Sequence, residues 1–296
     1  MTNNTLEQSL PIKKRRRRRP KSWLLKLLRQ FLRFSSHIFP GITSRLIYRL
    51  WFRTQRFTRP QRENEYARRS AYHHIIVNGE RVRIYTWGSG PVVLLMHGWN
   101  GRGTQLGAFI EPLLQQGYRV VTFDAPGHGE STAKRSTLFQ FSDSAIQISQ
   151  RFGPIDSIIA HSFGAPAAVH AIASGLSCQR VIMISPPASL LGLLEKFTRI
   201  TAISNGVIRR FKQRFEKDYG KNIWHIGSTV ERVSSLKPHG LIIHDQHDYD
   251  VPVAEAQEIH AAWPGSEIYI TQQLGHRRIL RHPLVIERII TFLSTD

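Results

Sequence analysis

Three side chains of the types that catalyse acyl transfer occur far apart in this sequence, in the order Ser162, Asp248 and His276. A serine hydroxyl becomes a nucleophile when a histidine takes its proton, and a carboxylate fixes the tautomer of that histidine. Ser162 lies in "SIIAHSFGAP", where an apolar run stops and small residues, Ala160 and Gly164, stand two positions to either side. This spacing is typical of a tight strand-to-helix turn that exposes the serine hydroxyl.

Two backbone amides are candidates for stabilising the oxyanion that such a serine would generate. The segment "MHGWNGRG" follows an apolar run, and Gly98 would let the backbone approach a ligand closely. We expect the amides of Trp99 and Phe163 to form an oxyanion hole beside Ser162. We interpret His97 as a structural histidine that braces this loop, rather than as the general base.

The acid must come from "HDQHDYDVP", which offers Asp245, Asp248 and Asp250. One of these carboxylates would orient the catalytic histidine and stabilise its imidazolium. A metal site built from His244, His247 and Asp248 is the alternative. It is disfavoured because nothing else in the sequence supplies a matching ligand cluster.

The base is expected on the loop after the last apolar run, in "QQLGHRRILRHP". His276 follows Gly275, so its imidazole would lie on a loop near the edge of a sheet. His282 is the competing histidine, but it directly precedes Pro283 and is typical of a residue at a helix start.

Short apolar runs alternate with helical segments and predict the elements that position these groups. Near-continuous Val/Ile/Leu runs indicate strands buried on both faces, and the alternation with helices predicts a parallel sheet. Asn78-Gly79 between two β-rich runs predicts a hairpin. Strands are expected within 91–98, 118–126, 157–162, 180–187, 240–245 and 267–273, and helices are expected to begin near Thr104, Phe139, Phe163, Val253 and Pro283.

One connection, about 187–238, is too long for a simple crossover and contains amphipathic pieces. We expect an inserted helical cap over the carboxyl edge of the sheet. Its apolar side chains would either line an acyl pocket or form the cap's own core: Leu190, Leu191, Leu193, Leu194, Phe197 and Ile200.

Taken together, "HGW", "DAPGHGES", "AHSFGA", "HDQHDYDVP" and "LGHRRIL" occur in the order found in α/β-hydrolases. Residues 72–296 resemble the esterase/lipase-like branch of that superfamily, with a helical cap. The resemblance implies a mostly parallel sheet flanked by helices, with Ser162 as nucleophile, His276 as base and Asp248 as acid. It also implies oxyanion amides at Trp99 and Phe163 and a structural role for "DAPGHGES". The sequence departs from the family pattern at Asp245, where glycine is common, which leaves open which aspartate orients His276.

The expected reaction is hydrolysis of a small-molecule carboxylic ester or thioester, with no metal or nucleotide cofactor. Acyl transfer, C–C bond hydrolysis and cofactor-free peroxidase chemistry share the same residues and remain alternatives. A membrane-associated protein that keeps the hydrolase fold without catalysis is a further alternative. Dehalogenases and epoxide hydrolases of this fold need an aspartate nucleophile, so their reactions are not expected.

Residues 1–71 differ in charge from the rest of the chain. Residues 1–60 hold sixteen Lys and Arg against one acidic residue, so they carry +15 of the net charge of +20. The run "PIKKRRRRRP" precedes "SWLLKLLRQFLRF", whose apolar and basic residues fall on opposite sides of a helix. A second helix is expected within 42–58, followed by a linker or an exposed helix.

Several roles are open for this N-terminal arm. A basic amphipathic helix with Trp and Phe suits an anionic membrane surface, here through residues 11–34. The alternatives are packing against the protein's own surface or an import signal. Nucleic-acid binding is not favoured by the charge and amphipathic pattern of the arm. With one cysteine and no uninterrupted apolar segment, the sequence predicts a cytoplasmic protein, peripheral on the inner face of the membrane if the arm attaches.

Overall fold

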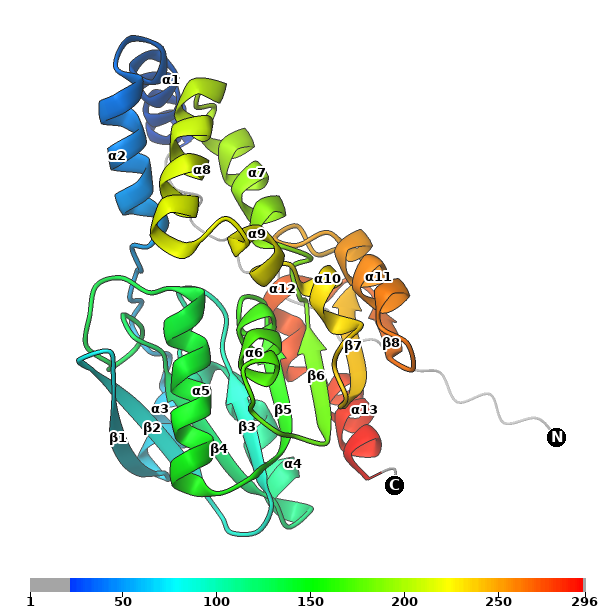
Figure 1. The fold of residues 1–296 in the computed structure, drawn as a ribbon. Helices are drawn as coiled ribbons and strands as arrows, with labels where there is room; N and C mark the ends of the chain where they lie inside the picture. Colours follow the sequence, from blue (N-terminus) through cyan, green and yellow to red (C-terminus); the bar gives the residue numbers. More distant parts are fainter. Residues whose placement is uncertain (1–21, 295–296) are drawn as a thin grey trace, which may run out of the picture.

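The computed structural model describes residues 22–294, which form an eight-stranded sheet in the order β1-β2-β4-β3-β5-β6-β7-β8 (Figure 1). Strands β3 to β8 are parallel, and β2 pairs antiparallel with both β1 and β4. The strands are β1 (Ala71–Val77), β2 (Glu80–Trp87), β3 (Val92–Met96), β4 (Arg119–Asp124), β5 (Ile155–His161), β6 (Arg180–Ile184), β7 (His239–Asp245) and β8 (Glu267–Thr271). The predicted α/β fold and all six predicted parallel strands are confirmed.

The hairpin between β1 and β2 turns at Asn78 and Gly79, as predicted. Both residues have positive φ, 50° and 79°, which is the backbone that a two-residue turn with right-handed strand twist requires. This antiparallel pair extends the sheet beyond β4.

Helices cover both faces of the sheet, because strands apolar on both sides need a packed layer on each. One face is covered by η1 (Gly103–Phe109), α4 (Ile110–Gln115) and α13 (Pro283–Leu293). The other is covered by α5 (Leu138–Phe152), α6 (Gly164–Ala173) and α11 (Val253–Ala262). The five helix starts were predicted within one residue, although the first segment is a 3₁₀-helix. Between β8 and α13 lie the short α12 (Gly275–Arg278) and η2 (Ile279–Arg281).

Four helices occupy the long connection between β6 and β7, and we call them the cap: α7 (Leu190–Thr201), α8 (Asn205–Tyr219), α9 (Ile223–Ile226) and α10 (Thr229–Val233). Figure 1 shows α7 and α8 standing above one edge of the sheet beside two N-terminal helices, α1 (Ser22–Ile38) and α2 (Pro40–Trp51). Tyr48 of α2 contacts Phe211 and Phe215 of α8, with ring centroids 5.4 and 6.4 Å apart. The N-terminal helices and the cap therefore share one aromatic cluster.

The second N-terminal helix is shorter than predicted. It ends at Trp51, and the chain then runs without helix to α3 (Gln61–Arg68); in this segment the guanidinium of Arg56 donates to the carbonyl oxygens of Ser131 and Ala133. Of its apolar residues, Ile47 is buried, whereas Ile42, Leu46 and Leu50 stay exposed.

The first helix also leaves much of its apolar side uncovered. Leu32 is buried, and the Ser36 hydroxyl accepts a hydrogen bond from the Ser204 amide. One side of α1 therefore contacts the cap. Six large side chains of α1 are exposed: Trp23, Leu27, Leu28, Phe31, Phe34 and Ile38. Residues 11–21, which carry the arginine run, lie outside the described residues. Within residues 22–294 no helix is long and apolar enough to cross a membrane.

Candidate active site

Ser162 occupies the turn between β5 and α6 with a φ of 53°, a conformation that is costly for a residue with a side chain. Its amide donates to the carbonyl oxygen of Ile184 at 2.9 Å, which ties the turn to β6. A Cβ on Gly164 would lie 2.6 Å from the Met96 carbonyl oxygen, and one on Gly98 would lie 2.8 Å from the Ser162 Cβ. Glycine is therefore required at both positions for the turn and the β3 loop to approach each other.

The loop after β3 brings the Trp99 amide to the same turn. Within residues 22–294 neither the Trp99 nor the Phe163 amide donates to a protein acceptor, so both remain available. The Trp99 and Phe163 rings meet edge to face, with centroids 5.0 Å apart, which holds the loop over the start of α6. The two predicted oxyanion residues thus lie side by side.

His97 braces this loop, as predicted. Its Nε2 accepts from the Ala125 amide at 3.0 Å, so Nδ1 carries the proton and donates to the Gly98 carbonyl oxygen at 2.7 Å. Complete burial lowers the pKa of His97 well below its usual value, so the ring is neutral. Asp124, in the "DAPGHGES" segment, accepts from the Gly103 and Glu130 amides and so joins two loops structurally.

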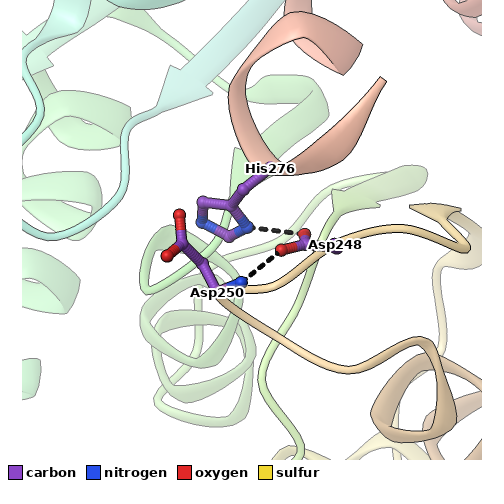
Figure 2. A group of neighbouring side chains, drawn as sticks. All are labelled: Asp248, Asp250 and His276. Atoms are coloured by element: carbon purple, nitrogen blue, oxygen red, sulfur yellow. Dashed lines mark hydrogen bonds and ion pairs between the residues drawn. The ribbon is translucent and has the colours of Figure 1, made fainter. Parts of the chain in front are cut away.

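Asp248 and His276 come together although they are on different loops. Nδ1 of His276 donates to Oδ2 of Asp248 at 2.7 Å, and Oδ1 of Asp248 accepts from the amides of Asp250 and Val251 (Figure 2). Burial alone would raise the pKa of Asp248, but the His276 hydrogen bond and charge, with the two amides, lower it to about 2. Asp248 is therefore a fixed anion at neutral pH.

Asp245 has a different set of partners. Its carboxylate accepts from the amides of His247 and Leu274 and from the Thr271 hydroxyl, at 2.8 to 3.0 Å. Burial alone would raise its pKa, but these donors, together with the Gly275 amide, lower it. Asp245 therefore connects the loop after β7 to the loop that carries His276, and within residues 22–294 it makes no hydrogen bond to the His276 ring.

A grouping of possible metal ligands exists here, different from the alternative considered and disfavoured from the sequence. Asp248, Asp250 and His276 each offer a ligand atom within 4.8 Å of the others (Figure 2). The alternative grouping of His244, His247 and Asp248 is not formed: His244 donates to the Val251 carbonyl oxygen, and His247 faces the Gln273 amide. Both Asp248 oxygens accept from protein donors, which accounts for this carboxylate without a cation.

His161 is a residue of the site that the sequence pattern did not reveal. Its ring lies 4.7 Å from that of His276, and its Nε2 donates to the His276 carbonyl oxygen at 3.0 Å. Burial lowers the pKa of His161 to about 3, so it is a neutral brace between the Ser162 turn and the His276 loop. As one of fourteen histidines, it carried no local signal. His282 lies at the start of α13, as predicted.

A cavity of about 330 Å³ opens above Ser162, and its wall comes from three parts of the chain. The sheet side supplies Ser162, Trp99 and Phe163, and α2 supplies Leu50 and Trp51, with Phe52 directly after it. The contribution of α2 was not expected, because nothing local marks a helix 110 residues before Ser162 as part of its site. Of the six cap residues considered from the sequence, Leu194 is fully buried in the core, whereas four line the cavity: Leu190, Leu193, Phe197 and Ile200.

Residues 92–288 match the model of the alpha/beta hydrolase family. The chain belongs to this family. Among curated proteins, none matches the sequence significantly. The strand order and the positions of Ser162, Asp248 and His276 after β5, β7 and β8 agree with an alpha/beta hydrolase.

Solved structures with low sequence identity share the fold of this alpha/beta hydrolase. A bromoperoxidase from Bacillus anthracis is 18% identical, with a TM-score of 0.59 over 76% of this chain and 100% of its own. An esterase from Exiguobacterium antarcticum is 15% identical, with a TM-score of 0.60 over 76% and 100%. A bacterial membrane phospholipase A is 16% identical, with a TM-score of 0.61 over 93% and 98%. The match to the phospholipase covers more of this chain than residues 72–296, which are only 225 of 296 residues. It therefore includes part of the N-terminal helices.

Proposed function

We propose that this alpha/beta hydrolase is a serine hydrolase that cleaves carboxylic esters or thioesters through an acyl-enzyme. The observation that carries the proposal is the 2.7 Å hydrogen bond between His276 Nδ1 and the Asp248 anion, beside a strained Ser162 turn that His161 joins to the His276 carbonyl oxygen. That bond places the ring proton on Nδ1, which leaves Nε2 to accept a proton.

In the proposed reaction, His276 Nε2 takes the Ser162 proton as the hydroxyl oxygen attacks the substrate carbonyl carbon. The carbonyl oxygen becomes an oxyanion held by the Trp99 and Phe163 amides, each worth about 3 kcal/mol in the transition state. The tetrahedral intermediate collapses, and the leaving alcohol or thiol takes the proton from His276. Water, activated by the same nitrogen, then attacks the acyl-serine and releases the acid.

The cavity favours an acyl substrate over the other chemistries that this fold supports. Most of its lining is apolar, which suits a hydrocarbon chain next to Ser162. Acyl transfer would use the same residues with another acceptor in place of water, whereas C–C hydrolysis and peroxidase chemistry find no specific support in the lining.

Covalent labelling with a fluorophosphonate tests the catalytic proposal. We expect the folded wild-type protein to be labelled at Ser162 and Ser162→Ala to remain unlabelled. Ser157→Ala is a matched control, since Ser157 is buried within β5 and lines no part of the cavity. A folded wild-type protein that resists labelling would rule out the activated serine and would favour a non-catalytic role.

The same proposal includes peripheral attachment to an anionic membrane through the N-terminal helices. Lys26 and Arg33 flank the exposed apolar side of α1, and Arg45 and Arg49 flank that of α2. Exposed apolar area beside basic residues suits an interface, where each Lys or Arg adds about 1 kcal/mol at an anionic surface. The fold likeness of a membrane phospholipase A, which extends into these helices, supports this attachment.

Vesicle sedimentation tests the attachment. We expect binding to phosphatidylglycerol vesicles, weaker binding to phosphatidylcholine vesicles, and a decrease with salt. Leu27→Gln combined with Phe31→Gln should reduce the binding about tenfold or more, since both apolar side chains would leave the bilayer. Ile76→Gln, at an exposed position on β1, should not reduce it. If removal of residues 1–35 leaves binding unchanged, attachment through this segment is wrong.

A further inference from the structure

We propose that the substrate is a long-chain acyl lipid, whose chain fills the cavity above Ser162 and points toward a membrane-facing mouth between Leu50 and Ile200. This inference rests on the proposed ester or thioester hydrolysis. It adds the class of acyl group, the path by which it reaches Ser162, and the face of the protein from which it arrives.

The size and chemistry of the cavity match one hydrocarbon chain. Its volume of about 330 Å³ lies near the lower end of the range for small-molecule sites, roughly 300–1,000 Å³. Apolar side chains from α2, α7, α8 and the core form most of the wall, and Ser162 is one of the few polar groups. An acyl chain would remove this wall from water at about 0.8 kcal/mol for each buried methylene group.

The mouth is identified by residues that both line the cavity and face solvent. Leu50 is 40% exposed and Ile200 is 63% exposed, although both belong to the lining. Deeper lining residues, such as Leu190 and Ile223, are buried. The cavity therefore reaches the surface at Leu50 of α2 and Ile200 of α7.

Both helices carry an apolar row that ends at this mouth. On α2, Ile42, Leu46 and Leu50 repeat every four residues and are all exposed. On α7, Leu193, Phe197 and Ile200 run from the interior of the cavity to the surface, over about 10 Å at 1.5 Å per residue. A continuous apolar path thus joins the exposed side of α2 to Ser162.

The occupant at the mouth is an anionic bilayer rather than another protein surface. The α2 row is flanked by the exposed Arg45 and Arg49, and α1 beside it exposes six further large apolar side chains with Lys26 and Arg33. With α2 on the bilayer, a lipid would enter with its ester bond ahead, and its chain would trail toward the membrane. After the alcohol or thiol has left, water hydrolyses the acyl-serine. The freed fatty acid then departs along the same path.

Chain-length dependence gives the first test. We expect kcat/KM for p-nitrophenyl octanoate to exceed that for the butyrate at least about tenfold, because the added methylenes enter the apolar cavity. For p-nitrophenyl laurate, kcat/KM should be little higher than for the octanoate, since the terminal carbons of the laurate chain would lie beyond the mouth. A maximum at butyrate would overturn the proposal.

Two variants locate the chain. Leu193→Trp should fill the cavity and lower the octanoate-to-butyrate ratio about tenfold. Ile200→Glu should lower the hydrolysis of a fluorogenic long-chain ester in phosphatidylglycerol vesicles about tenfold relative to butyrate in solution. Leu284→Glu, an equally exposed leucine on α13, is the matched control and should leave both ratios unchanged. Unchanged ratios in both cavity variants would also overturn the proposal.

Failure of this inference and failure of the proposed function give different results. Laurate should quench the fluorescence of Trp51 and Trp99, which line the cavity, even in Ser162→Ala. Fluorophosphonate labelling without laurate binding or chain-length preference would refute the lipid inference alone. Laurate binding without labelling would refute the hydrolase and leave a lipid-binding cavity, whereas binding of laurate to Leu193→Trp as tightly as to wild type would place the chain elsewhere.

Discussion

The loops beneath the cavity and the helices above it are held by different forces. Beneath it, buried carboxylates accept hydrogen bonds from backbone amides: Asp124 from Gly103 and Glu130, Asp245 from His247 and Leu274, and Asp248 from Asp250 and Val251. Above it, α2 and α8 meet mainly through the rings of Tyr48, Trp51, Phe52, Phe211 and Phe215.

This difference matches what each region has to do. Hydrogen bonds are directional and fix distances to a few tenths of an ångström, which a proton transfer between Ser162 and His276 would require. Aromatic packing supplies stability without one required geometry, so a wall built in this way can adapt to chains of different length. The contrast predicts that changes below the cavity mainly affect chemistry, and that changes above it mainly affect stability and substrate range.

The largest expected effect comes from replacing Asp248, the proposed acid below the cavity. Asp248→Asn keeps the shape of the side chain but removes the anion, so His276 loses the partner that holds its proton on Nδ1. We expect kcat for a short ester to fall about 10³–10⁴-fold. Steady-state kinetics with p-nitrophenyl butyrate measures this loss.

Asp245→Asn is the matched control, because Asp245 ends β7 three residues before Asp248 and also accepts hydrogen bonds from amides. We expect it to lower the free energy of unfolding, since the loop that carries His276 loses an acceptor, while kcat falls less than tenfold. A larger loss of kcat in Asp245→Asn than in Asp248→Asn would contradict the assignment of the acid.

The region below the cavity was largely predictable because its requirements are local. Positions 98 and 164 require glycine so that the two loops can approach each other closely. This requirement can be predicted from the few residues around each motif. The choice between Asp245 and Asp248 was not settled by the sequence. The resemblance favours Asp248, but Asp245 adds a second carboxylate three residues earlier, and only the fold decides which carboxylate meets His276.

The region above the cavity was not predictable in the same way. The periodicity of α1 and α2 shows that each has an apolar side, but not what that side contacts. Ile47 packs inside while Leu46 and Leu50 face out, because α8, more than 150 residues later, covers only one side of α2. The role of Leu50 at the cavity mouth follows from this long-range contact and has no counterpart in the local pattern.

A smaller effect, on stability rather than chemistry, is expected from Phe211→Ala in α8. Phe211 is fully buried, and its ring lies 5.4 Å from Tyr48, 5.6 Å from Trp51 and 5.6 Å from Phe215. Removing the ring leaves a void where the N-terminal helices pack against the cap. The free energy of unfolding, measured in urea, should therefore fall by about 3–5 kcal/mol. Phe31→Ala, at an exposed position on α1, should change the free energy of unfolding by less than about 0.5 kcal/mol.

Because the loops below the cavity keep their own hydrogen bonds, labelling of Ser162 by a short fluorophosphonate should slow far less in Phe211→Ala than in Asp248→Asn. Equal losses of labelling in the two variants would mean that the packing above the cavity also sets the geometry below it.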